Sequence, residues 1–438
     1  MRRLLWFAAL LALVACGGGR PYVPLPATGT LPNGPSFLDD DTDKVPCPRS
    51  AAHGVPLVIH DRSGLPIRRL TLYFTSSVPS NLAQFQFLNR DGTMTTFAIG
   101  NRAQPFPLFR CFPGSLARGG RRFTFPLLPG GRVWIVFGKL PIAGAANGQF
   151  VGPTGWIRGK AGFDVPYDTV ELSDNNPGIF VNMTRVDMLG LPMQLRVLPP
   201  GKSKPWAAVG EKTDQYVRLL REMRGDAPFG QTVILVRPLR VPRIINPSHL
   251  PNFPDVFNSA SYYPGGFINK VAGYYQNPPA AITYSTAYKS YCPGSWSAGS
   301  TGSAFTFTQG GQTNTYPNSQ LTTNYIFADS PAYSSNTCTY LLDKILLQEL
   351  NRGVAMTASH PVTAPSSFYP KGTINNQYAC LLHNYSLHFA TYAFAYDDAA
   401  NQASTITNPS PRLVELTIGR MPRGLPKPLP RKVCTALR

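Results

Sequence analysis

Short runs of alternating apolar and polar residues, each bounded by turn-forming residues, recur along the first half of the chain. Within residues 67–76, Leu70, Leu72 and Phe74 share one face and alternate with more polar side chains. This period of two is typical of antiparallel strands that turn one face to a core and the other to water. The 44 prolines, 39 glycines and only 14% charged residues also favour strands and structured loops over helices. We therefore expect a β-sandwich or barrel with strands at 55–60, 67–76, 84–88, 123–128 and 133–137.

The pattern changes near residue 205, where apolar residues begin to recur at helical spacing. This spacing predicts helices at 214–223, 267–275, 339–350 and 377–385, and an apolar run predicts a strand at 232–236. The part of the chain that can fold, about 390 residues, exceeds what one hydrophobic core usually organises. We expect a β-barrel lobe at 46–200 and a mixed α/β lobe at 201–390.

The first 45 residues carry an export signal and a linker. Arg2 and Arg3 precede an apolar run, residues 4–15, that is too short to span a bilayer. The run ends in Leu-Val-Ala followed by Cys16, which resembles the lipobox of bacterial lipoproteins, whose cysteine takes a diacylglyceryl group. We expect a signal peptide at 1–15, lipid on Cys16, a Pro/Gly-rich tether at 16–45, and a location outside the cytoplasm in a bacterial envelope. The alternative is an ordinary signal peptide with a chance cysteine, and hence a secreted protein.

The remaining cysteines are even in number, which suggests disulfides in an exported chain. Six cysteines allow fifteen pairings, and the sequence does not choose among them. No pair forms a CxxC motif and the six histidines are scattered, so we expect neither a zinc site nor any other cofactor. The six are Cys47, Cys111, Cys292, Cys338, Cys380 and Cys434.

The net charge of +19 raises the question of a polyanionic partner. The basic residues are dispersed, and the one dense basic stretch is the Pro-rich tail at 421–438. With an export signal present, we do not expect nucleic-acid binding. The tail is either a solvated segment or a surface attracted to anionic lipid or envelope polysaccharide.

Residues 256–328 contain no acidic residue and are dominated by Tyr, Ser, Thr, Asn and Gly. Such a segment suits an exposed aromatic surface that stacks on sugar rings. An ordinary β-rich loop region of an extracellular protein has the same composition, and both interpretations stay open.

Two carboxylates with apolar neighbours stand out in a chain that has few of them. Glu171 lies on the polar face of a predicted strand, between Val170 and Leu172, and Asp187 lies between Val186 and Met188. A pair of carboxylates facing one cleft is what glycoside hydrolysis needs: one protonates the leaving oxygen and the other activates water or attacks the anomeric carbon. A simple hairpin turning near Asn176 would pair Glu171 with about Val181, so the return strand must bend or change partner before Asp187.

The segments GRVWIVFG (131–138), YDTVELS (167–173) and NMTRVDMLGLPMQL (182–195) resemble, in order and spacing, glycoside hydrolase family 64. This family comprises β-1,3-glucanases with a thaumatin-like barrel. Farther on, YAFAYDDAANQAS (392–404) and LVELTIG (413–419) are similar to the strands that close the family's barrel. The resemblance extends in patches from about residue 53 to 420.

The resemblance implies roles for individual residues. The family's proton donor falls on Glu171 and its base on Asp187, and the family's inverting reaction places the two carboxyls about 6.5 to 9.5 Å apart with a water between them. The family's polar contacts to the glucan fall on Ser173, Asn175 and Thr184. Phe180 occupies a position where the family usually has Trp, which implies weaker stacking there. Without the resemblance, two strand-edge carboxylates with local hydrogen bonds would be the simpler interpretation.

Together these observations predict a mainly β protein with an α+β part. A thaumatin-like barrel at 46–200 would be completed by strands at 391–420, with the α/β lobe inserted and a cleft between the lobes. Asp397 and Asp398 are candidates for the cleft wall or for a turn. We expect a monomer that hydrolyses β-1,3-glucan by inversion without a cofactor, with a glucan-binding module or a structural envelope lipoprotein as alternatives.

Overall fold

The computed structural model describes most of the chain after residue 54. The described residues are 47, 55–111, 123–125, 128–174, 178–198, 207–286, 289–328, 337–397, 404–408, 411–430 and 434–435. The expected signal peptide, Cys16 and the tether lie outside them, as do Asn175 and Asp398.

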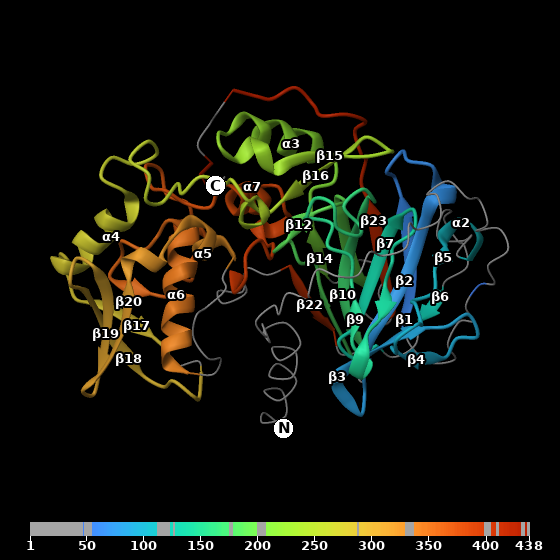
Figure 1. The fold of residues 1–438 in the computed structure, drawn as a ribbon, viewed down its shortest axis with the longest axis horizontal. Helices are drawn as coiled ribbons and strands as arrows, with labels where there is room; N and C mark the ends of the chain where they lie inside the picture. Colours follow the sequence, from blue (N-terminus) through green and yellow to red (C-terminus); the bar gives the residue numbers. More distant parts are fainter. Residues whose placement is uncertain are drawn as a thin grey trace.

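Two large sheets form the strand-rich lobe on the right of Figure 1. The eight-stranded sheet consists, in spatial order, of β22 (Thr405–Asn408), β11 (Ile179–Asn182), β10 (Tyr167–Asp174), β7 (Arg132–Phe137), β2 (Leu70–Val78), β3 (Asn81–Leu88) and β4 (Met94–Thr96), with β5 (Phe106–Pro107) beside β2. The five-stranded sheet consists of β14 (Ala207–Gly210), β13 (Met193–Leu198), β23 (Leu413–Ile418), β1 (Val55–Asp61) and β6 (Phe123–Phe125). The expected strands in the first half of the chain are all present, with ends shifted by a few residues.

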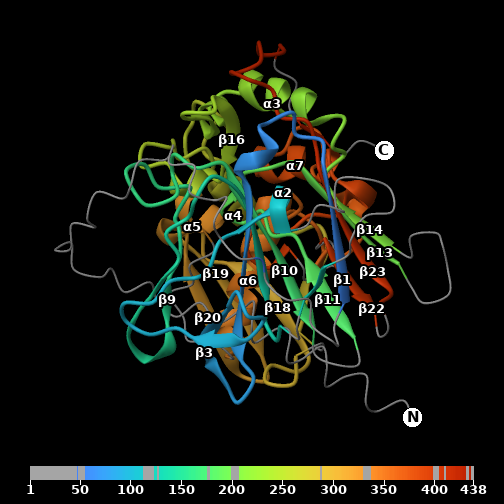
Figure 2. The ribbon, with the colours of Figure 1, turned by 90° about the vertical axis from the view of Figure 1, so that its right-hand side faces the viewer.

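The last strands of the chain lie inside these sheets. β23 pairs with β1 in parallel and with β13 in antiparallel orientation, and β22 pairs with β11. Figure 2 shows β1, β23, β13 and β14 side by side. Since β14 pairs with β13, the five-stranded sheet continues past the expected lobe boundary at residue 200.

The two sheets pack face to face through their apolar sides. One small gap between them is lined from both sheets, by Leu57, Val133, Val170, Leu172, Leu195, Val414 and Leu416. These residues are the apolar half of the alternating pattern, so their burial stabilises the sandwich at roughly 25 cal/mol for each Å² of apolar surface.

The opposite face of the eight-stranded sheet is also covered, which the alternating pattern did not predict. Tyr73 and Trp134 on this face are almost fully buried and belong to a second apolar cluster with Tyr167. The chain after β7 supplies the cover, with Leu140, Ile142 and Phe150 packed on the cluster. The expectation of one solvent-facing side for β2 is therefore wrong. This covering segment contains β8 (Ala143–Gly144), η4 (Ala146–Gly148) and β9 (Phe150–Val151), while η2 (Ile67–Arg69) and α2 (Leu108–Cys111) flank β2.

The middle of the molecule links the sandwich to the second lobe (Figure 1). A three-stranded sheet joins β12 (Met188–Leu189), β16 (Val241–Ile245) and β15 (Val233–Val236). Helices α3 (Tyr216–Gly225) and α7 (Gln377–Asn384) contact each other close to this sheet. Short turns complete the region: η5 (Phe229–Thr232), η6 (Pro247–His249) and η9 (Leu387–Phe389).

A second five-stranded sheet and three helices form the lobe on the left of Figure 1. The sheet consists of β20 (Gln312–Pro317), β19 (Ala304–Gln309), β18 (Ser295–Ser300), β17 (Ile282–Ser285) and β21 (Ser359–His360). The helices are α4 (Phe267–Gln276), α5 (Thr323–Ala328) and α6 (Cys338–Arg352), with turns η7 (Asn318–Gln320) and η8 (Pro365–Ser367). Thr337 caps the start of α6, and Gly353 ends it with the positive φ that favours glycine. The predicted helices at 267–275 and 339–350 match α4 and α6 closely.

The aromatic side chains of residues 256–328 mostly face inward. Tyr275, Tyr284, Trp296, Phe305 and Phe307 are all buried in the core of this lobe. The alternation of aromatic and small polar residues in β17–β20 therefore builds a half-buried sheet, and the expectation of an exposed aromatic surface is wrong for these residues.

Three disulfides connect the six cysteines: Cys47–Cys111, Cys292–Cys338 and Cys380–Cys434. The last one closes a C-terminal strap, residues 421–430 together with Cys434, that passes over α3 (Figure 1, red). Leu429 N–H donates to Arg221 O, and Arg221 Nε donates to Lys427 O. The expected solvated tail is therefore packed onto the fold over its described part. Among the described residues, no helix is both long and apolar enough to cross a membrane.

Candidate active site

Glu171 lies on the face of the eight-stranded sheet that is turned away from the five-stranded sheet. Val170 and Leu172 point into the sandwich core, so Glu171 points to the opposite side with Tyr167. Its Oε1 accepts a hydrogen bond of 2.7 Å from Arg132 Nη2, on the neighbouring strand β7. The Glu171 side chain is 18% exposed and that of Arg132 39%. The carboxylate is thus at the edge of solvent, with a cation beside it.

The hairpin of β10 and β11 places further expected residues on this face. Its register pairs Glu171 with Asn182, one residue beyond the expected Val181, and Ser173 with Phe180. Side chains of directly opposed residues lie on the same side of a sheet, so Glu171, Ser173 and Phe180 share one face. Asn182 is buried, and its Nδ2 lies 3.4 Å from Glu171 Oε2.

The chain leaves the sheet after Asn182, as the position of Asp187 required. Thr184 forms an isolated bridge with Tyr392, and Arg185 N–H donates to Tyr392 O at 2.7 Å. Met188 and Leu189 then pair with Ile245 and Ile244 of β16. The segment 183–191 therefore changes strand partner between Glu171 and Asp187.

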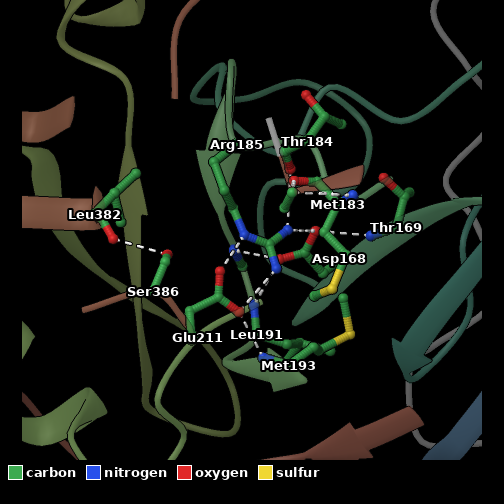
Figure 3. A network of polar contacts seen from close by, with 12 residues as sticks. Asp168, Thr169, Met183, Thr184, Arg185, Leu191, Met193, Glu211, Leu382 and Ser386 are labelled. Carbon is green, nitrogen blue, oxygen red and sulfur yellow. Dashed lines mark hydrogen bonds and ion pairs between the residues drawn. The ribbon is translucent and has the colours of Figure 1, made fainter. Parts of the chain in front are cut away.

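A buried network fixes this segment (Figure 3). Arg185 is completely buried, and its guanidinium donates to Asp168 at 2.9 Å and to Glu211 at 2.7 and 3.0 Å. Asp168 Oδ2 also accepts from the N–H groups of Gly190 and Leu191 at 2.8 and 3.0 Å. The two carboxylates thus hold both the cation and the backbone on either side of Asp187.

The charges in this network depend on one another. Burial raises the pKa of Asp168, and the Arg185 guanidinium and the N–H groups of Leu191 and Thr169 oppose that shift. Burial lowers the pKa of Arg185, but Asp168 and Glu211 outweigh it, so that pKa lies above its usual range. The guanidinium therefore remains charged, and the network acts as a rigid support rather than as a proton donor.

Asp187 points into a different neighbourhood, next to the turn η6. Its Oδ1 lies 2.8 Å from His249 Nε2, and its side chain is 43% exposed. The His249 ring packs against Trp156, with ring centroids 5.5 Å apart. Trp156 in turn packs on the cluster that includes Tyr167 and Trp134. Asp187 is therefore at the rim of the same sheet face as Glu171.

Separate contacts attach both carboxylates to strand β10. Glu171 is part of β10, and Asp168, three residues earlier, holds the backbone just after Asp187. Burial raises the pKa of the Tyr167 hydroxyl, and the charge of Asp187 adds to that rise, so the two side chains are close enough to interact. The arrangement brings together Glu171, Ser173, Phe180 and Asp187 on one side of the molecule.

The family model for β-1,3-glucanases of glycoside hydrolase family 64 matches residues 54–418. The chain belongs to this family. It is thus a glycoside hydrolase of the β-1,3-glucanase type. No curated protein matches the chain.

Solved structures of family 64 proteins have the same fold. A β-1,3-glucanase domain from Clostridium beijerinckii superimposes with a TM-score of 0.64 at 18% identity, covering 85% of this chain and 100% of that one. A laminaripentaose-producing β-1,3-glucanase in complex with laminaritetraose gives 0.64 at 19% identity, covering 84% and 98%. The laminarihexaose complex of a Paenibacillus barengoltzii family 64 enzyme gives 0.53 at 18% identity, covering 85% and 76%.

Asp397 does not line a cleft in this family 64 chain. Its side chain is completely buried and accepts from Arg352 Nη2 at 2.9 Å, and it contacts His383 Nε2 at 2.9 Å. Burial raises the pKa of Asp397, but His383 and Arg352 outweigh it and hold that pKa below its usual range. The carboxylate anchors α6 to α7 and the following loop, so the expectation of a cleft-wall role for Asp397 is wrong.

Three residues of the site escaped the sequence-based prediction: Arg132, Asn182 and His249. Arg132 and Asn182 were within reach of it, because they lie directly opposite Glu171 on the adjacent strands. His249 gives no local signal, since it lies 62 residues from Asp187. Within the described residues, no group of three or more His, Cys, Asp or Glu side chains is placed to hold a metal ion.

Proposed function

We propose that this protein hydrolyses β-1,3-glucan with inversion at the anomeric carbon, with Glu171 as proton donor and Asp187 as base. The observation that carries the proposal is the position of both carboxylates on one side of the eight-stranded sheet, each attached to β10 by its own contacts. Inversion needs two carboxyls on opposite sides of the cleaved bond with room for one water. A side chain that is 43% exposed, as in Asp187, leaves a carboxylate oxygen open to such a water.

In this reaction Glu171 gives its proton to the glycosidic oxygen as the bond to the anomeric carbon breaks. The ion pair with Arg132 favours the ionised carboxylate, so the proton-donor state requires Arg132 to move away from Oε1. Arg132 is 39% exposed, which gives its guanidinium room to turn toward solvent or toward a sugar hydroxyl. Glucan binding would then switch Glu171 into its donor state.

Asp187 accepts a proton from water as the water oxygen bonds to the anomeric carbon. The displaced sugar leaves with the proton from Glu171, so one water is consumed for each bond cleaved. No cofactor is needed for these steps.

The glucan would lie across the face that carries Glu171, in a cleft between the thaumatin-like lobe and the α/β lobe. Phe180 supplies an apolar face for a glucose ring, and Ser173, Thr184 and Asn175 supply polar groups. A pocket of about 230 Å³ between η6 and α5, lined by Pro247, Ser248, Leu250, Pro251, Phe253, Thr323, Asn324 and Phe327, supports a hollow at the lobe junction next to His249. The relatives solved with laminaritetraose and laminarihexaose support this class of substrate.

The cellular setting is part of the proposal. The apolar run at 4–15 and the lipobox-like end at Cys16 favour export and lipid anchoring in a bacterial envelope. The enzyme would then act, as a monomer, on glucan that reaches the cell surface from outside.

The test is hydrolysis of laminarin followed by NMR of the first product. We expect the α-anomer from the β-linkage, and a β-anomer would mean retention and a different role for Asp187. Glu171→Gln should abolish cleavage of laminarin but spare part of the activity on an aryl glucoside with an activated leaving group, because that group needs no proton. Asp187→Asn should damage both reactions equally. Near-normal laminarin hydrolysis by either folded variant would refute the assignment, and a wild type that binds laminarin without cutting it would indicate a binding module.

A further inference from the structure

We infer that His249 is a positioning residue that orients the carboxylate of Asp187 toward the attacking water. The inference rests on the proposed role of Asp187 as base. It depends on three features of the described structure: the hydrogen bond between the two side chains, the way η6 is fixed beside Asp187, and the exposure of the pair.

The chain brings His249 to Asp187 through a defined set of backbone contacts. Strand β16 pairs Ile245 with Met188, which sets the register of the two segments. Asn246 N–H then donates to Asp187 O at 2.9 Å, and Asn246 Nδ2 donates to Val186 O at 2.6 Å. The same Asn246 caps η6 by accepting from Ser248 N–H. These bonds fasten the turn that carries His249 directly onto the segment that carries Asp187.

The ring of His249 is held on its other side as well. Trp156 packs against it at 5.5 Å with an interplanar angle of 30°. An imidazole held between an indole and a carboxylate loses little further freedom when Asp187 reacts, so the orientation is set before substrate binds.

The hydrogen bond leaves one oxygen of Asp187 for the water. An ionised carboxylate has no proton to donate, so Nε2 of His249 must carry the hydrogen and donate it to Oδ1. With Oδ1 occupied in this way, Oδ2 is the oxygen that takes the proton from water. Without the imidazole the carboxylate could rotate about its Cβ–Cγ bond, and fewer of its orientations would be productive.

Two other histidine–carboxylate pairs of the described structure show what a purely structural pair looks like. His360 with Glu349 and His383 with Asp397 have no solvent exposure on either side chain. In the pair of His249 and Asp187 the side chains are 23% and 43% exposed. This pair is therefore open to a substrate, which the buried pairs are not.

The test compares His249→Ala with His249→Gln, whose amide can still donate to Oδ1. We expect His249→Ala to lower kcat on laminarin about 10- to 100-fold, the range for losing a hydrogen bond to a charged group, with little change in KM. His249→Gln should recover most of the loss. The matched control is His60→Ala, a half-buried histidine in β1 of the other sheet, which should keep full activity.

A double-mutant cycle separates positioning from general damage. Because His249 acts through Asp187, His249→Ala in the Asp187→Asn background should cost nothing further. The inference is overturned if folded His249→Ala keeps normal kcat, if His249→Gln is as impaired as His249→Ala, or if the loss is unchanged in the Asp187→Asn background. An Asp187→Asn variant with near-normal hydrolysis would refute the proposed base itself, whereas an inactive Asp187→Asn beside a fully active His249→Ala would refute only the positioning.

Discussion

Glu171 and Asp187 differ in the groups that surround them, although both are carboxylates at the rim of one sheet face. Glu171 has a guanidinium on one side and an amide on the other, from Arg132 and Asn182. Asp187 has an imidazole and a longer reach into solvent. Different environments are what allow two identical functional groups to take the separate parts of acid and base.

Phe180 tests whether the glucan crosses this face. If its partly exposed ring stacks on a glucose unit, Phe180→Ala should lose roughly 1 to 2 kcal/mol of apolar contact and raise KM on laminarin accordingly. The change in kcat should be smaller, because stacking acts on bound substrate and transition state alike. Steady-state kinetics with laminarin would measure both, and an unchanged KM in the folded variant would place the glucan elsewhere.

Arg185 tests the support beneath Asp187. Arg185→Met would leave Asp168 and Glu211 buried without their cation, which should cost about 3 to 5 kcal/mol of unfolding free energy. Denaturant titration would measure the loss. The control is Arg218→Met, which removes an exposed ion pair with Glu222 on α3 and should change stability little. Equal, small effects of the two substitutions would mean that the network does not carry the segment.

Residue-level prediction from the sequence succeeded where the chemistry is local. The period of two in 167–173 correctly placed Glu171 and Ser173 opposite Val170 and Leu172. Asp397 was misassigned because its sequence neighbours gave no sign of Arg352 and His383, which come from α6 and α7. A side chain whose partners are distant in the chain cannot be distinguished by local pattern from one that faces solvent.

The secondary structure was largely predictable because its signals are local. Helical spacing predicted α4, α6 and α7 to within about two residues, as expected for strongly periodic segments. What covers each element was not predictable. The outer face of β2 is buried because residues 140–150 fold back onto it, and period-two alternation carries no information about that later segment.

The C-terminal strap tests whether a terminal segment stabilises the elements beneath it. The Cys380–Cys434 bond closes a loop of 54 residues, and Cys434 N–H donates to Gln377 Oε1 at the start of α7. Cys434→Ser should therefore lower the free energy of unfolding by roughly 2 to 4 kcal/mol. Thermal unfolding of wild type and variant would show the difference. No loss of stability in the variant would mean that the strap is held by its contacts to Arg221 and its neighbours alone.

The whole molecule is closed by its own ends. β1, close to the start of the described chain, lies beside β23, close to its end, and the strap then covers α3 between the two lobes. Everything before Cys47 is thus left over from the fold, and the proposed lipid anchor would join the enzyme to the membrane through that segment. A chain of this length spans at most roughly 100 Å, so the active face can reach substrate well away from the lipid surface.

Anchoring is tested by Cys16→Ser, which removes the thiol that would carry the lipid. The expected result is a protein that leaves the membrane fraction or accumulates with its signal peptide uncleaved, because the lipidated cysteine is both the anchor and the processing site. Fractionation of cells that express wild type and variant, followed by mass spectrometry of the mature N-terminus, would measure both effects. Laminarin hydrolysis by the released protein should be unchanged, since Cys16 is remote in sequence from Glu171 and Asp187 and contributes nothing to their chemistry. Membrane retention with normal maturation of the variant would contradict lipid anchoring and leave an ordinary signal peptide in its place.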